Sequence, residues 1–485
     1  MIKILKKCLG IYENMSAPVK SSIWFTICSV VQKAITLLST PIFTRLLTTE
    51  QYGEYTVYQS WYQILTVFAT LNLAAGVFNN GLLKYEKSRN EFTSSMQGLS
   101  TTVTGGLFLL YLCAMDFWNE LMGLSTLYVV AMFVELLFVP AYHFWSKRER
   151  FSYRYKKLIV TTIIIAFGSQ MLDFISVLNT TYKAEARVLS YVLVQVGIGL
   201  VFYVYNAVRG KKFFDKEIWK FALGFNIPLI PHYLAFSMLN QADRIMIDKM
   251  VGTGQAAIYG VAYSVSMIMN IVTTAINNSF IPYTYKAIRD KKFEDIRKNT
   301  NVLLLIVGAG CILAMAFAPE IIKIFASESY YEAIWIMPPL AASVYFMFLY
   351  PLFGNIEFYF EKTKFVTIAS CTGAVANVIL NYIFIGKYGY LAAGYTTLIC
   401  YILFSFAHYV FHKKVIRQKL EEIQQIYDIK FMLIFSGILL LIMFGMTMIY
   451  EYIVIRYGII ALILFVAFVK RQVLISKLKE IRGGR

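Results

Sequence analysis

Long apolar stretches alternate with short polar segments along the whole chain. Ten stretches of 20 or more residues contain no Asp, Glu, Lys or Arg: 55–83, 92–115, 188–208, 221–242, 250–285, 299–319, 333–356, 365–386, 388–412 and 431–450. A helix needs roughly 20 apolar residues to cross a bilayer. Four more apolar segments each contain one ion: 21–44 with Lys33, 121–146 with Glu135, 158–182 with Asp173 and 452–469 with Arg456. The pattern predicts an all-α integral membrane protein with about 14 transmembrane helices.

The charge distribution predicts the orientation of these helices. The net charge of +18 could indicate nucleic-acid binding, so the position of the charges has to decide. With the N-terminus inside, the inner segments carry 37 of the 46 Lys and Arg residues. The outer side carries eight, namely Arg45, Lys183, Arg187, Arg244, Lys249, Lys323, Lys387 and Arg456. Such an asymmetry is the positive-inside signature, so we expect both termini in the cytoplasm and no nucleic-acid partner.

A weak internal repeat predicts two lobes. Residues 54–60 (Glu-Tyr-Thr-Val-Tyr-Gln-Ser) and residues 258–264 (Ile-Tyr-Gly-Val-Ala-Tyr-Ser) each follow a charged helix end, about 204 residues apart. Two homologous bundles are typical of secondary transporters. We therefore expect two six-helix lobes in a pseudo-twofold arrangement, followed by two C-terminal helices. The predicted domains are an N-lobe at 1–210, a C-lobe at 211–412, and helices 13–14 with a basic cytoplasmic tail at 413–485.

Pro228 and Pro231 interrupt the first helix of the second half. Two prolines three residues apart remove backbone donors and bend a helix. The bend could act as a gate between the lobes, or it could be a static kink of the kind common in membrane helices.

Two motifs resemble a known family. Thr40 to Tyr55, which ends in Tyr52-Gly53-Glu54-Tyr55, is similar to the signature after the first helix of bacterial polysaccharide-unit flippases. Ala242-Asp243-Arg244, followed by Tyr259-Gly260-Val261-Ala262, resembles the signature of their second lobe. These flippases belong to the multidrug/oligosaccharidyl-lipid/polysaccharide exporter superfamily.

The resemblance implies a function and a location. Family members move undecaprenyl-diphosphate-linked oligosaccharides from the cytoplasmic to the outer leaflet of the bacterial plasma membrane, through a cationic cavity between two alternating lobes. We thus expect a multi-pass inner-membrane protein that contacts membrane lipid and works beside a polysaccharide polymerase and other assembly proteins. The motifs carry a basic, substrate-binding role onto Arg45 and Arg244, and more weakly onto Lys84.

The ions inside predicted spans are further candidates. A lone ammonium at mid-bilayer depth costs about 3 kcal/mol on insertion scales, so Lys33 is expected to meet an anionic group there. That group is either the substrate diphosphate or a buried acid, Asp173 or Glu135. Asp173, Glu135 and Asp243 could themselves couple ions or act as charge partners.

Other function classes fit less well. A cation-coupled multidrug or metabolite exporter of the same superfamily would have a more acidic cavity. A membrane glycan polymerase or ligase would need a large outer domain, whereas every predicted outer loop has about a dozen residues or fewer. The sequence contains no Gly-x-x-x-x-Gly-Lys-Ser/Thr nucleotide loop and no metal-binding spacing, so we expect neither enzymatic activity nor a cofactor. The energy source, whether protons, sodium or membrane potential, stays open.

Overall fold

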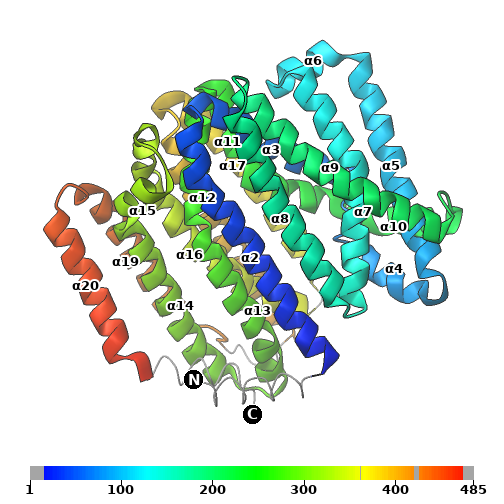
Figure 1. The fold of residues 1–485 in the computed structure, drawn as a ribbon. Helices are drawn as coiled ribbons and strands as arrows, with labels where there is room; N and C mark the ends of the chain where they lie inside the picture. Colours follow the sequence, from blue (N-terminus) through cyan, green and yellow to red (C-terminus); the bar gives the residue numbers. More distant parts are fainter. Residues whose placement is uncertain (1–15, 361, 420–424, 473–485) are drawn as a thin grey trace, which may run out of the picture. The chain divides into compact units, whose positions relative to one another are not determined.

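All regular structure in the described part of the chain is helical (Figure 1). The computed structural model describes residues 16–360, 362–419 and 425–472. The lysines of the N-terminal tip (Lys3, Lys6 and Lys7) and the end of the predicted basic tail lie outside these residues. Among the described helices, 11 are long and apolar enough to cross a membrane, or up to 12 if a bent pair counts as one span. The prediction of an all-α membrane protein is therefore confirmed.

Contacts divide the chain into two compact units, Met1–Ser237 and Met238–Arg485. The first unit holds α2 (Ala17–Leu46), α3 (Thr49–Ala69), α4 (Phe78–Lys84), η1 (Glu86–Ser88), α5 (Arg89–Cys113), α6 (Met115–Met122), α7 (Thr126–Phe151), α8 (Tyr155–Leu178), α9 (Lys183–Gly210), α10 (Lys216–Asn226), η2 (Ile227–Leu229) and the beginning of α11 (Ile230–Met250). Within this unit α2 packs along α8, and α7 and α8 both pack against α9 (Figure 1).

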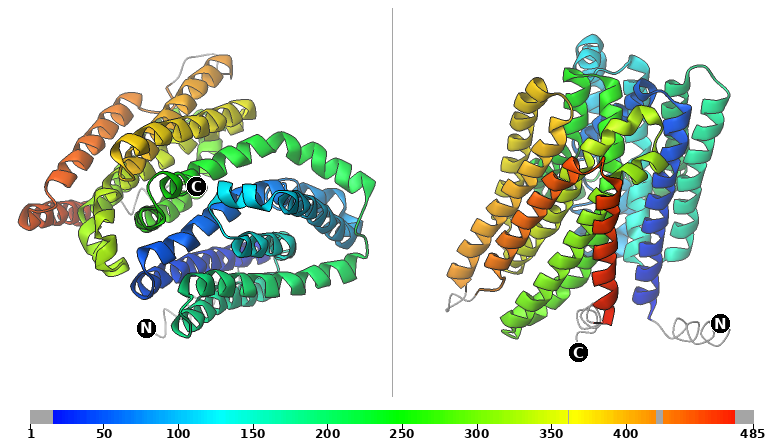
Figure 2. Two further views of the ribbon diagram at one scale, coloured as in Figure 1. Left: turned by 90° about the horizontal axis from the view of Figure 1, so that it is seen from above. Right: turned by 90° about the vertical axis from the view of Figure 1, so that its left-hand side faces the viewer.

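The second unit continues from α11. It holds α12 (Thr253–Ser266), α13 (Ile268–Arg289), α14 (Phe293–Ala316), α15 (Ala318–Phe325), η3 (Glu328–Trp335), α16 (Met337–Tyr359), α17 (Thr363–Tyr388), α18 (Ala392–Lys419), α19 (Ile429–Met448) and α20 (Ile453–Val469). Here α18 packs against both α16 and α17 (Figure 2). The short outer loop predicted between the spans 299–319 and 333–356 is helical in large part, because α15 and η3 fall on it.

The lobe boundary near residue 210 stays a prediction, as do the domains drawn from it. Residues beyond it make contacts in the first unit: the Trp219 indole Nε1 of α10 donates to the carbonyl of Ser95 on α5, 3.0 Å away. Ile218 and Ala222 of α10 join the buried core of that unit, which is centred on Phe78, Phe92 and Phe144.

The second predicted span, 55–83, is not one helix, so this part of the prediction is wrong. It is α3 and α4 separated by turns, in which Leu71 and Asn72 have φ values of 50° and 49°. Broken helices are tolerated at membrane depth when other groups satisfy the freed backbone. Asn226 does this: its Nδ2 donates to the Leu71 carbonyl at 2.7 Å, and its Oδ1 accepts from the Val77 N–H at 3.0 Å.

The proline-containing segment is also interrupted, as predicted. α10 ends at Asn226, the 3₁₀ turn η2 contains Pro228, and Pro231 is the second residue of α11. Proline is well tolerated near a helix start, because the N–H it lacks has no partner there. The break thus places Asn226 at a helix end, from which its side chain holds the 71–77 turns.

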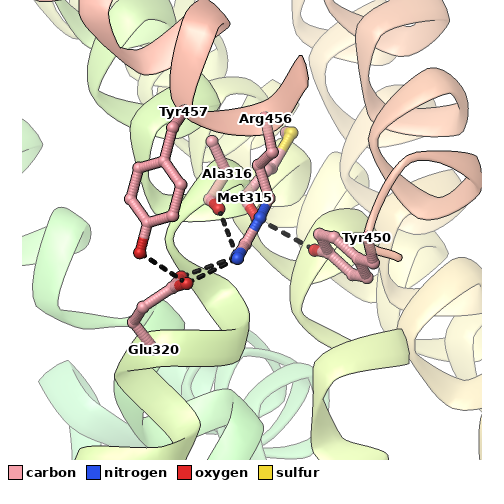
Figure 3. A network of polar contacts seen from close by, with 6 residues as sticks. All are labelled: Met315, Ala316, Glu320, Tyr450, Arg456 and Tyr457. Carbon is pink, nitrogen blue, oxygen red and sulfur yellow. Dashed lines mark hydrogen bonds and ion pairs between the residues drawn. The ribbon is translucent and has the colours of Figure 1, made fainter. Parts of the chain in front are cut away.

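Arg456 lies in the first turn of α20 and fixes that helix to α14 and α15 (Figure 3). Its guanidinium forms two bonds with the Glu320 carboxylate, at 2.6 and 2.5 Å, and donates to the Ala316 carbonyl at 3.1 Å. Tyr457 donates to the same carboxylate at 3.0 Å. The ion in the last predicted span therefore has a structural partner within its own unit.

Candidate functional site

Lys33 lies on a weakly packed face of α2. Its side chain is exposed, as are those of Gln32 and Ala34 beside it. Neither of the two acids proposed as its partners forms an ion pair with it: Glu135 and Asp173 make other contacts in the same unit. Among the described residues of its unit, Lys33 therefore pairs with neither of these two acids.

Glu135 is buried among tyrosines. Its side chain on α7 is 1% exposed, and Oε2 accepts from the Tyr58 hydroxyl at 2.9 Å. The Tyr62 side chain also lies beside it. Both tyrosines belong to α3, so this contact ties α3 to α7 and involves no basic residue.

Asp173 on α8 lies next to a buried arginine that sequence reasoning did not select. The Ser190 hydroxyl donates to Asp173 Oδ1 at 2.7 Å, and Arg187 is close enough to interact with its charge. Arg187 is 3% exposed, and its guanidinium carbon lies 3.7 Å from the ring centre of Phe43 and 4.2 Å from that of Tyr55. The acid in this cluster thus has a resident cation beside it.

Asp243 on α11 is the centre of a second buried cluster, and here its hydrogen-bond donors are neutral. Its Oδ2 accepts from the Tyr259 hydroxyl at 2.5 Å and from the Thr397 hydroxyl at 2.7 Å. Its Oδ1 accepts from the Asn381 amide at 2.5 Å. Asn377 and Thr396 extend the cluster through hydrogen bonds to the Asn381 amide. The hydrogen-bond donors to this buried carboxylate are thus neutral, and the next residue in the chain is the buried Arg244.

The two clusters occupy corresponding helices of the two halves. The first uses α2, α3, α8 and α9, and the second uses α11, α12, α17 and α18. In chain order α8 and α17 are the fifth predicted span of their half, and α9 and α18 are the sixth. Arg187 on α9 therefore supplies a positive charge where the second half offers threonine hydroxyls on α18.

Arg244 follows Asp243 but makes different contacts. It is 7% exposed, and its Nη1 donates to the Asn240 carbonyl at 2.7 Å and to Gln241 Oε1 at 2.9 Å. Its guanidinium carbon lies 4.2 Å from the ring centre of Tyr263. It is a buried cation held by neutral groups.

Arg45 and Lys84 are both exposed. Arg45 lies in the last turn of α2, and its Nη1 donates to the Pro41 carbonyl at 2.7 Å. Lys84 ends α4, with its ammonium 4.3 Å from the ring centre of Phe221. The structure brings Arg45 close to Lys183, since both line one pocket, and it places no other candidate from the motifs beside Lys84.

The sequence analysis did not identify the neutral hydrogen-bond donors to Asp243 or the buried pair of His408 and Glu357. Asn381 and Thr397 carry no signal, because polar residues are ordinary at helix contacts in membranes. His408 on α18 and Glu357 on α16 form a buried contact, 2.9 Å between Nδ1 and Oε1. The scattered histidines gave no motif, and only the packing of α16 on α18 joins this one to an acid. Among the described residues no group of three or more His, Cys, Asp or Glu side chains could hold a metal ion.

Comparisons with known proteins agree with this architecture. Residues 19–288 match the family described as polysaccharide biosynthesis protein, and residues 228–383 match the MatE family. Protein 1 of the Lsg locus of Haemophilus influenzae is 21% identical over 372 residues, which are 74% of this chain and 89% of that protein. A second membrane protein of the same organism is 23% identical over 381 residues, 76% of this chain and 89% of that protein.

Solved structures share the fold. The lipid II flippase MurJ, in an inward closed conformation, has a TM-score of 0.69 at 14% identity, covering 93% of this chain and all of that one. An inward-facing multidrug resistance transporter of the MATE family has a TM-score of 0.60 at 14% identity, covering 83% of this chain and all of that one. With the match over 19–288, the chain belongs to the polysaccharide biosynthesis protein family.

Proposed function

We propose that this protein moves a polyprenyl-diphosphate-linked oligosaccharide from the cytoplasmic to the outer leaflet of the bacterial plasma membrane, by alternating access of its two lobes. Both termini are cytoplasmic in this proposal. The substrate's lipid tail stays in the bilayer, so the protein has to accommodate only the diphosphate and the sugars. Moving a small ion from water into a medium of low dielectric constant costs on the order of 20 kcal/mol in the idealised limit, so the diphosphate needs cations along its path.

Lys33 is the observation that carries the proposal. It is a charge within an apolar helix, it is exposed on α2, and Glu135 and Asp173 are engaged elsewhere. An unneutralised ammonium at this depth is expensive, at about 3 kcal/mol. An anionic headgroup that binds to Lys33 neutralises the ammonium charge and so offsets this free-energy cost. We assign Arg45, Arg244 and, with less support, Lys84 to the same cationic route, while Pro228 and Pro231 mark the hinge.

Asp243 is the proposed coupling residue. Its carboxylate is 1% exposed and is hydrogen-bonded by neutral donors from three other helices. A proton or a monovalent cation that binds and leaves during the cycle would balance its charge. Asp173 is a second coupling candidate, and Arg187 lies near it as Arg244 follows Asp243. Glu135, which accepts a hydrogen bond from Tyr58, is a further coupling candidate.

The test compares single variants of the cations for surface polysaccharide. Lys33→Ala, Arg45→Ala and Arg244→Ala are expressed at matched membrane levels in cells that lack the native protein. Each is expected to lower surface polysaccharide, and Lys33→Ala most strongly, because no protein group replaces its charge. Lys387→Ala is the matched control: it removes an exposed cation from the last turn of α17 that is not assigned to the route. Undiminished polysaccharide in all three test variants would refute the cationic route.

A cation-coupled exporter of small molecules is the second candidate, and the match of residues 228–383 to the MatE family favours it. Drug efflux by the purified protein in vesicles, with no transfer of a fluorescent polyprenyl-diphosphate sugar between leaflets, would support this candidate over the flippase.

A further inference from the structure

A pocket of about 450 Å³ lies in the first unit where α2, α3 and the start of α9 meet. Its lining is Arg45, Leu46, Leu47, Thr48, Gln51, Thr181 and Lys183. This volume is within the range of small-molecule sites, about 300–1,000 Å³. The lining contains two cations, two hydroxyls and an amide, and no acid. Its chemistry is therefore suited to an oxyanion.

The charges around this pocket run against the usual bias. Only eight Lys and Arg residues are predicted on the outer side, where the positive-inside rule disfavours them. Two of the eight line this pocket, and a third, Arg187, lies one helical turn along α9 from Lys183. Topology alone would spread these few cations among the outer loops.

Arg187 adds a buried positive charge next to the pocket. Its guanidinium lies against the rings of Phe43 and Tyr52, which neighbour the pocket residues in α2 and α3. Its Nε and Nη1 find no hydrogen-bond partner among the described residues. The buried Asp173 lies close enough to interact with the same charge.

Lys183 keeps donors for a ligand. Its ammonium is 3.2 Å from the Leu46 carbonyl, and an ammonium has three N–H donors. Arg45 lines the same pocket, and its Nη1 donates to the Pro41 carbonyl. Arginine and lysine together are a common set of phosphate ligands.

We propose that this pocket binds the phosphate group of a lipid headgroup in the outer leaflet. If the proposed function holds, on which this assignment to a substrate rests, the group is the diphosphate of the translocated lipid, held at the outer end of its path before release. Arg45 and Lys183 contact the phosphate oxygens, and Thr48 and Thr181 donate from their hydroxyls.

The experiment measures lipid binding to the full-length protein in nanodiscs of phosphatidylcholine. The probe is a fluorescent polyprenyl diphosphate without sugars, and the competitors are phosphatidylglycerol and inorganic pyrophosphate. Lys183→Gln is the test variant, Lys183→Arg the conservative variant and Lys387→Gln the control at another outer helix end. We expect Lys183→Gln to weaken binding about tenfold, Lys183→Arg to restore most of it, and the control to stay within about twofold.

Each outcome decides the proposal. Equal loss in Lys183→Gln and Lys387→Gln would mean a general effect of net charge and would overturn it, as would unchanged binding in Lys183→Gln. When binding does depend on Lys183, competition identifies the source: strong competition by phosphatidylglycerol indicates bulk anionic lipid, whereas weak competition indicates the polyprenyl diphosphate. Binding is measured here without transport, so the pocket proposal can be supported even when Lys33→Ala, Arg45→Ala and Arg244→Ala leave surface polysaccharide undiminished. That combination of results would refute only the proposed flippase function.

Discussion

Replacing Asn226 by alanine tests how the break between α3 and α4 is stabilised. Asn226 is fully buried, and its amide bonds two backbone groups of the turn, the Leu71 carbonyl at 2.7 Å and the Val77 N–H at 3.0 Å. Leaving one buried polar group without a partner costs about 1–3 kcal/mol. Two groups give about 2–6 kcal/mol. Since chains unfolded in a membrane also find polar partners, we expect the lower end, about 2–3 kcal/mol.

Gly76 provides the matched variant. A Cβ at this position would lie 2.4 Å from Asn226 Oδ1, so alanine must displace the same amide. We therefore expect Gly76→Ala to destabilise the protein by a similar amount, and the double variant Gly76→Ala/Asn226→Ala to be little worse than either single one. Two changes that break one shared interaction are not additive.

The assay is unfolding of the purified protein in mixed micelles with increasing dodecyl sulfate, which yields the free energy of unfolding. Asn179→Ala is the control, because that amide is exposed at the end of α8 and bonds only the local Ile175 carbonyl. The reasoning fails if Asn226→Ala is as stable as Asn179→Ala, or if the Gly76 and Asn226 effects simply add.

Three further predictions concern Arg456, Asp243 and Asp215. Arg456→Met should lower the free energy of unfolding by about 2–3 kcal/mol, since it leaves the partly buried Glu320 carboxylate without its cation. Adding Glu320→Gln should recover part of that loss in the same micelle assay, and no recovery would contradict the ion-pair account. Asp243→Asn should keep the fold but make transport in vesicles insensitive to imposed proton and sodium gradients, and retained gradient dependence would remove Asp243 from coupling. Asp215 is the N-cap of α10 and lies outside the membrane-spanning segments, and the Lys212 ion pair and the Ile218 N–H lower its pKa. Because the pKa in the folded protein lies below that in the unfolded chain, the ionised carboxylate stabilises the fold above the ordinary aspartate pKa. This stabilisation is lost as the pH falls through the lowered pKa. Asp215→Ala should cost about 1 kcal/mol at neutral pH while Asp215→Asn keeps the cap, a difference that thermal unfolding at pH 7 measures and that equal melting temperatures would contradict.

The location of the helices could be predicted because hydrophobicity is a local property. The apolar stretches marked the spans, and the two motifs at Arg45 and Asp243-Arg244 led to the family that the match over 19–288 now shows. The break inside 55–83 could not be predicted in the same way. It depends on Asn226, which is about 150 residues away in the chain.

The candidate site divides along the same line. The sequence by itself determined which residues carry charge inside the membrane, because an ion in an apolar run stands out: Lys33, Glu135, Asp173 and Arg456. Only the tertiary structure decided their partners. In the structure Glu135 accepts a hydrogen bond from Tyr58, and Arg187 lies beside Asp173. Asp243 has neutral hydrogen-bond donors, and Arg456 forms an ion pair with Glu320. The physical reason is that the hydrophobicity of a segment depends only on its own residues. Neutralising a charge inside it depends on which distant helices pack against that charge.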